Sequence, residues 1–121
     1  IDLFAEVVTI HKDDSIFVNV PWPTLGKRHM SDMDLDNDGI LWAAATSDPG
    51  DDGPYESGIY KIGKFQKLND KMEFIIADSF PKQFVFQRNK VEALTIAGNK
   101  MVFATDDENL GAAINISING K

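Results

Sequence analysis

Acidic side chains at repeated positions are the residues of this sequence best suited to chemistry. Asp32 precedes a short apolar stretch, and Glu92 takes the matching position 60 residues later. Asp48 and Asp107 follow the second apolar stretch of each copy, 59 residues apart. Converging carboxylates repel one another, and Ca²⁺, which takes six to eight oxygen ligands, relieves that repulsion. The repeat therefore predicts a calcium site at Asp32, Asp48, Glu92 and Asp107, unless these acids simply end strands in water.

A second acidic group lies in one tight turn. Asp34, Asp36 and Asp38 alternate within Asp-Leu-Asp-Asn-Asp-Gly, the spacing with which a calcium loop begins. The later ligands of such a loop are missing, because Trp42 and Ala45 occupy the positions where an acid is needed. Two interpretations stand side by side: Ca²⁺ bound in the turn, or an acidic β-turn held by bonds from its side chains to its backbone.

Composition excludes several classes of function. The 121 residues carry a net charge of −7, which repels phosphate backbones, so nucleic acid is not an expected partner. There is no cysteine for disulfide or thiol chemistry, and the apolar runs are too short to span a bilayer. His11 and His29 are the only histidines, and no nucleophile elbow, zinc motif or phosphate loop accompanies them.

The elements that must position the acids are strands. Alternating or continuous apolar runs separated by turn residues predict an all-β chain, with helix at most incidental. The run from Ile40 to Thr46 does not alternate, which is typical of a strand covered on both faces. The expected strands are residues 7–10, 16–20, 33–35, 40–46, 59–62, 72–77, 91–96, 100–105 and 112–118, and residues 26–29, 64–71 and 80–86 are expected to connect them.

These strands form a repeat of about 60 residues. Gly39 and Gly98 mark the same turn in both copies, and Ala45-Thr46 corresponds to Ala104-Thr105. Sequential four-stranded antiparallel meanders of this period are the blades of β-propellers. We expect a single β domain over residues 1–121: the end of a preceding blade at 1–23, a complete blade at 31–80 and a partial blade at 90–121.

Two segments also resemble a known group. The turn and strand at Asp36 to Ala44 look like those of many six- or seven-bladed propellers, and Lys90 to Leu94 with Ala104 to Asn109 resembles the phytase-like and SdiA-regulated propellers. The resemblance implies a partial propeller of about two blades, calcium binding and, as in some members, phosphate-ester hydrolysis. The lysine- and arginine-rich cleft that would receive a polyphosphate is missing from this sequence.

Two functions follow as hypotheses. The first is a binding module for a protein or small molecule, with Ca²⁺ at the channel-facing carboxylates. The second is a metal-assisted hydrolase of phosphate or carboxylic esters. Because a propeller closes with four to eight blades, the rest of a longer chain or further copies must complete the ring, and a barrel or sandwich of about nine strands is the alternative. The chain begins at Ile1 rather than Met, so we expect an upstream segment and slightly favour a secreted or periplasmic location.

Overall fold

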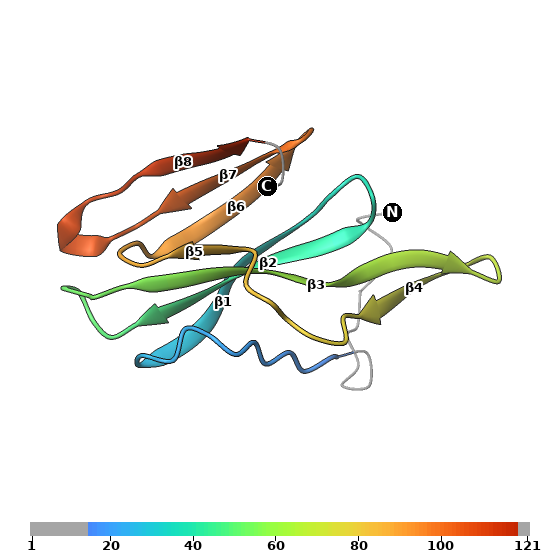
Figure 1. The fold of residues 1–121 in the computed structure, drawn as a ribbon, viewed down its shortest axis with the longest axis horizontal. Helices are drawn as coiled ribbons and strands as arrows, with labels where there is room; N and C mark the ends of the chain where they lie inside the picture. The colour runs from blue at the N-terminus through green and yellow to red at the C-terminus, as the bar shows by residue number, and fades with distance from the viewer. Residues whose placement is uncertain (1–14, 119–121) are drawn as a thin grey trace, which may run out of the picture.

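The computed structural model describes residues 15–118 and consists of two antiparallel β-sheets joined by one connection (Figure 1). The predicted all-β, antiparallel class is confirmed. The elements are β1 (Lys27–Leu35), β2 (Ile40–Asp48), β3 (Glu56–Leu68), β4 (Lys71–Ile76), β5 (Phe84–Phe86), β6 (Val91–Ala97), β7 (Lys100–Thr105), the 3₁₀ helix η2 (Glu108–Leu110) and β8 (Ile114–Ile118).

The first sheet is a meander with a divided outer edge. Its strand order is β1-β2-β3-β4, and each strand pairs antiparallel with the next. β3 is 13 residues long, and β4 pairs with its second half while β5 pairs with Ser57 to Ile59 in its first half. The chain thus returns along the edge of β3 before it crosses to the second sheet, β6-β7-β8.

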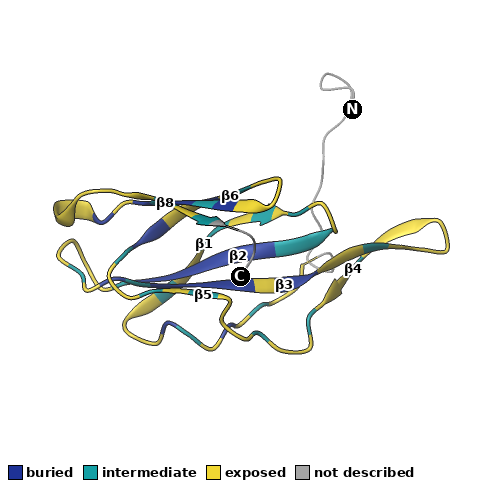
Figure 2. Ribbon diagram, turned by 45° about the horizontal axis from the view of Figure 1, so that its top comes forward, coloured by how far each residue is buried: buried dark blue, intermediate teal, exposed yellow. Residues whose placement is uncertain are grey.

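The central strand β2 is covered on both faces, as its continuous apolar run predicts. Ala43, Ala44 and Ala45 are fully buried. Ala44 packs in a cluster with Trp42 and residues of the second sheet, whereas Ala43 and Ala45 pack with Val20 and the residues around it. Figure 2 shows this concentration of buried residues along β2 and β3, with β4 and the loops exposed.

The core between the sheets is aromatic and aliphatic. Trp42, Ala44 and Ile59 of the first sheet meet Leu94 and Phe103 of the second. β5 supplies two rings to the same layer, since Phe84 and Phe86 lie 5.5 and 5.1 Å from the Phe103 ring, measured between centroids. Burial of this apolar surface is the main force that holds the two sheets together.

Hydroxyl groups from three strands of the first sheet bind the start of β6. The carbonyl of Val91, at the start of β6, accepts hydrogen bonds from Ser31 Oγ at 2.7 Å and Thr46 Oγ1 at 3.0 Å. The Val91 N–H in turn donates to Ser57 Oγ at 3.0 Å. These side chains satisfy backbone groups of β6 that no neighbouring strand reaches, which makes β1 and β6 adjacent strands of different sheets.

The two sheets carry an irregularity at the same place. The β1–β2 register shifts between Met30 and Asp32, and the β6–β7 register shifts between Val91 and Ala93. Bulges insert one residue into a strand and are position-specific features of a fold. Each sheet thus has a bulge in the strand that begins it.

Aligned on these bulges, equivalent residues point in the same direction. Ala44 lies opposite the residue after the first bulge, and Ala104 lies opposite the residue after the second. Ala44 faces the second sheet, and Ala104, which alternates with the core residue Phe103, faces away from the first. The sequence alignment that pairs Ala45 with Ala104 is therefore wrong by one residue, which in a strand reverses the face of every side chain.

Several predicted boundaries also differ from the structure. Residues 27–29, expected in a connection, belong to β1, and residues 64–68, also expected to connect, extend β3. Residues 84–86 form β5 rather than linker, and residues 16–20 run without strand pairing. The strands expected at 40–46, 72–77, 91–96 and 100–105 are confirmed within one or two residues, and the one at 7–10 lies outside the described residues.

Candidate functional site

The densest charged cluster is centred on Lys90, which immediately precedes β6. Its ammonium lies 2.6 Å from Glu108 Oε1, 2.9 Å from Asp48 Oδ2 and 3.7 Å from Glu92 Oε1. It also lies 5.7 Å from the centre of the buried Tyr55 ring. The lysine side chain is only 11% exposed, so the structure places a protein cation among carboxylates contributed by three separate segments.

The pKa values of the cluster reflect this pairing. The hydrogen bonds to Glu108 and Asp48 raise the pKa of Lys90 well above its usual range. The hydrogen bond from Lys90 lowers the pKa of Asp48, against a smaller opposing effect of burial. Charged forms of both groups are thus stabilised, and neither is prepared to exchange a proton near neutral pH.

Asp107 binds the backbone of the same lysine. Its Oδ1 accepts the backbone N–H of Lys90 at 2.6 Å, and its Oδ2 accepts from Asn89 Nδ2 at 2.9 Å and Thr105 Oγ1 at 3.0 Å. The carboxylate is 6% exposed and fully engaged by these donors. Asp107 therefore fixes the chain entering β6 and orients Lys90 rather than facing an open site.

Asp32 and Asp34 bind backbone groups of the neighbouring sheet. Asp32 Oδ2 accepts the N–H of Leu94 at 2.7 Å, and Asp34 Oδ2 accepts the N–H of Ile96 at 2.7 Å. The bond from Ile96, followed by one from Leu35 N–H, lowers the pKa of Asp34. Carboxylates on β1 thus take the place of a missing strand along the edge of β6.

Asp36 closes the turn between β1 and β2. Its Oδ1 accepts the N–H groups of Asp38 and Ile40, each at 2.9 Å, and its Oδ2 accepts the indole N–H of Trp42 at 2.9 Å. Burial by itself would raise the pKa of Asp36. The hydrogen bonds outweigh this effect, so the pKa is lowered overall. This is the pattern of an acidic β-turn with a side chain bonded to the backbone two residues on.

The predicted calcium ligands are therefore only partly brought together. Asp48 and Glu92 both lie beside the Lys90 ammonium, and Asp107 accepts the backbone N–H of Lys90. Asp32 lies in the interior of β1, because that strand begins at Lys27 rather than near Met33, and its carboxylate contacts β6 instead. Among residues 15–118, no group of three or more His, Asp or Glu side chains is arranged to hold a metal ion.

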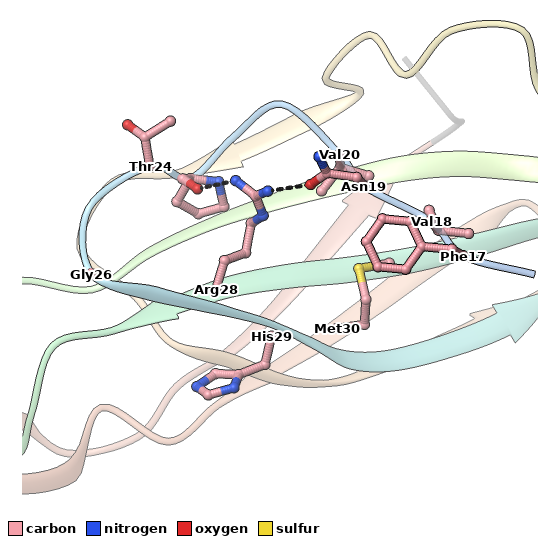
Figure 3. A pocket seen from close by; sticks show the side chains of 10 residues that line it. Phe17, Val18, Asn19, Val20, Thr24, Gly26, Arg28, His29 and Met30 are labelled. Carbon is pink, nitrogen blue, oxygen red and sulfur yellow. Dashed lines mark hydrogen bonds between the residues drawn. The ribbon is translucent and has the colours of Figure 1, made fainter.

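A separate pocket of about 370 Å³ lies beside the start of β1 (Figure 3). Arg28 points across it, donating to the carbonyl of Pro23 at 2.7 Å and to Asn19 Oδ1 at 2.6 Å. His29 points to the other side of the strand. The guanidinium is thus used to hold residues 19–23 against β1.

Sequence reasoning missed the residue at the centre of the cluster. In the sequence, Lys90 is notable only as part of the resemblance to propellers. One signal was available: Asn89-Lys90 directly precedes an apolar strand, and Glu92 follows two residues after the lysine. Because a buried ammonium without a partner is costly, a lysine held at this position needs carboxylates beside it.

No known family model matches the sequence, and neither a curated protein nor a solved structure gives a match. Within the part of the chain that the structure describes, no helix has the length and apolar character needed to cross a membrane.

Proposed function

We propose that this chain is a pair of consecutive β-propeller blades that serves as a binding module. The stacking supports the proposal: two meanders with the same bulge lie face to face, equivalent residues point the same way, and their first strands are adjacent. Radially arranged blades stack in this manner. Both sheets also expose an apolar face on the side away from the shared core.

The exposed apolar faces of the two sheets are the observation that supports a binding role. On the first sheet, Met33 of β1 is 55% exposed, and an apolar depression of about 580 Å³ lies between it and Phe74 of β4. On the second sheet, Ile114 and Ile116 of β8 are 73% and 60% exposed. Large apolar side chains gathered on a sheet surface mark interaction sites more often than isolated ones do.

The carboxylates favour binding over metal-assisted hydrolysis. Such a reaction needs acids that are free to hold a cation and water. Asp48 and Glu92 instead neutralise Lys90, and Asp32, Asp34, Asp36 and Asp107 accept hydrogen bonds from the protein. Calcium binding stays a prediction, and a Ca²⁺ ion at the Lys90 cluster would have to displace the ammonium.

Two measurements test the proposal. An uncharged dye that fluoresces on apolar surfaces, such as Nile red, should bind the folded protein in dilute solution. Ile114→Ser should weaken this signal without changing the melting temperature, and Leu110→Ser, on the exposed η2, should not.

A screen of carboxylic esters and phosphoesters, with and without Ca²⁺, should show no turnover. Turnover that requires Ca²⁺ and disappears in Glu92→Gln would replace the binding module with a hydrolase. Dye binding that is unchanged by Ile114→Ser would remove the exposed face as the basis of the proposal.

A further inference from the structure

The two uncovered faces are the two halves of an interface that the chain already makes. Within the molecule, Trp42, Ala44 and Ile59 on one side of the first sheet pack against Val91, Leu94 and Phe103 on the second. Each of these sets has an equivalent on the opposite side of the other sheet, and both equivalents are uncovered or only partly covered.

The uncovered face of the second sheet matches the covered face of the first. Counted from the bulges, Val102 is equivalent to Trp42 and Ala104 to Ala44. Val102 lies opposite Ile116 and Ala104 opposite Ile114 in the β7–β8 register, so these four side chains share one surface. We name it the forward face.

The partly covered outer face of the first sheet matches the covered face of the second. Met33 and Leu41 are equivalent to Leu94 and Met101, which lie in the core between the sheets. With Ile62 and Phe74 they form what we name the rear face, on which Val18 and Val20 cover the buried Ile62 while Met33 stays exposed. The chain seen in blue in Figure 1 runs along this side, away from the second sheet.

We propose that the rear face of one molecule docks on the forward face of a second copy, in the arrangement that the first and second sheets adopt within each chain. This inference rests on the binding module proposed above and names its partner. The contact is head-to-tail, because it joins two different surfaces. Such a contact repeats until the rotation closes a ring, or continues as an open stack.

The internal interface argues for this occupant over an unrelated protein. A second copy presents the same backbone bulge, the same strand order and an apolar surface that has already been shaped to fit its counterpart. The edge strand β8 reinforces the choice, since exposed Ile114 and Ile116 lie opposite Ala104 and Val102, and Lys100 lies at the end of this apolar surface rather than at its centre. Charged groups at the centre of such a contact would oppose docking.

Complementary variants of the whole chain test the head-to-tail geometry. Met33→Lys damages only the rear face and Ile116→Lys only the forward face, and both side chains are exposed in the single molecule, so each variant should fold. The mass of the unmodified protein, measured by sedimentation equilibrium, should rise with concentration. Each variant alone should stay monomeric, and an equimolar mixture should form a 1:1 dimer that grows no further.

A variant outside both faces serves as the control. Leu110→Lys lies on η2 outside both faces and should associate like the unmodified protein. If Ile116→Lys loses its native circular dichroism, Ile114→Lys serves in its place. A monomeric unmodified protein at every concentration would overturn the inference, as would single variants that still associate. Dye binding by a monomeric protein would leave the binding module standing while removing this partner.

Discussion

The seam between β1 and β6 uses carboxylates in two different ways at its two ends. At the end where β6 begins, Asp48, Glu92 and Glu108 surround the ammonium of Lys90. Further along, Asp32 and Asp34 accept backbone N–H groups, and no lysine or arginine of residues 15–118 forms an ion pair with either. The same residue type therefore balances a full charge at one end and replaces a strand partner at the other.

This difference shows that a cluster of acidic residues in a sequence does not reveal which positive group will neutralise it. Ca²⁺, a lysine ammonium and a row of amide donors all satisfy carboxylate oxygens, and the choice depends on which of them the fold delivers to the site. Here the fold delivers Lys90 to one end and the open edge of β6 to the other. Variants that remove each counter-charge separately measure how much each end contributes.

Removal of Lys90 should have the largest effect. Lys90→Met leaves three carboxylates close together without a cation, and we expect a loss of about 2–3 kcal/mol in the free energy of unfolding. Because the pKa of Lys90 is raised, its contribution is fully present below about pH 10 and is lost only as the pH rises beyond the folded-state value. Urea denaturation at neutral pH measures the loss.

The same variant asks whether a metal can replace the lysine. Ca²⁺ should raise the melting temperature of Lys90→Met, by binding the freed carboxylates of the folded state, and should leave the unmodified protein unchanged. Lys67→Met, which removes a lysine paired with Asp70 in solvent, is the matched control and should change stability by at most about 0.5 kcal/mol. Equal effects of the two substitutions would mean that the cluster does not hold the seam together.

Loss of a backbone partner should be smaller. Asp32→Ala leaves the partly buried N–H of Leu94 without its acceptor, and we expect a cost of about 1–2 kcal/mol. Amide hydrogen exchange at Leu94 should accelerate more than at Phe103, which pairs within the sheet. Unchanged exchange at Leu94 would show that water or another group takes over the bond.

The pH dependence of Asp34 distinguishes the two ends further. Hydrogen bonds from Ile96 and Leu35 lower its pKa in the folded state. Its contribution is therefore present above the unfolded pKa of about 3.9 and is lost as the pH falls through the lower folded value. Asp34→Asn should make stability decline less steeply below about pH 4, with a change of only a few tenths of a kcal/mol at pH 7. Urea midpoints between pH 7 and pH 2 test this.

The exposed acid of the turn should matter least. Asp38 contributes its backbone N–H to Asp36, while its own side chain is exposed. Asp38→Asn should change the free energy of unfolding by less than about 0.5 kcal/mol. If it also weakens a measurable heat of Ca²⁺ binding, the turn is a calcium site after all and the interpretation of Asp36 must change.

The sequence predicted the strands that show a continuous or alternating apolar run and missed those that are short or mixed in character. The apolar run of β2 and the alternation in β7 reveal buried strands. The second half of β3 mixes lysine and glutamine with Phe65 and Leu68, so it lacks a clear period, and it pairs with β4. β5 is three residues long and close to Pro81, so neither period nor length distinguishes it from a loop.

For the candidate site, the sequence identified the acids but not their roles. Asp48 and Glu92 both lie beside the Lys90 ammonium, a partner that the repeat did not reveal. The position of Asp32 depended on where β1 begins, and Lys27 to His29 look like a connection since none of them is buried. Lys90 was hidden because its partners come from β2, β6 and η2, which are far apart in the sequence.

The divided edge of β3 has a consequence for how this protein avoids misassembly. A long bare strand edge is a template on which other chains can add strands and grow into fibrils. β4 and β5 each occupy part of that edge, so the first sheet offers short and staggered stretches in place of one continuous row of free amides and carbonyls. The first sheet can thus carry exposed apolar side chains such as Met33 while the edge of β3 offers no continuous template for strand addition.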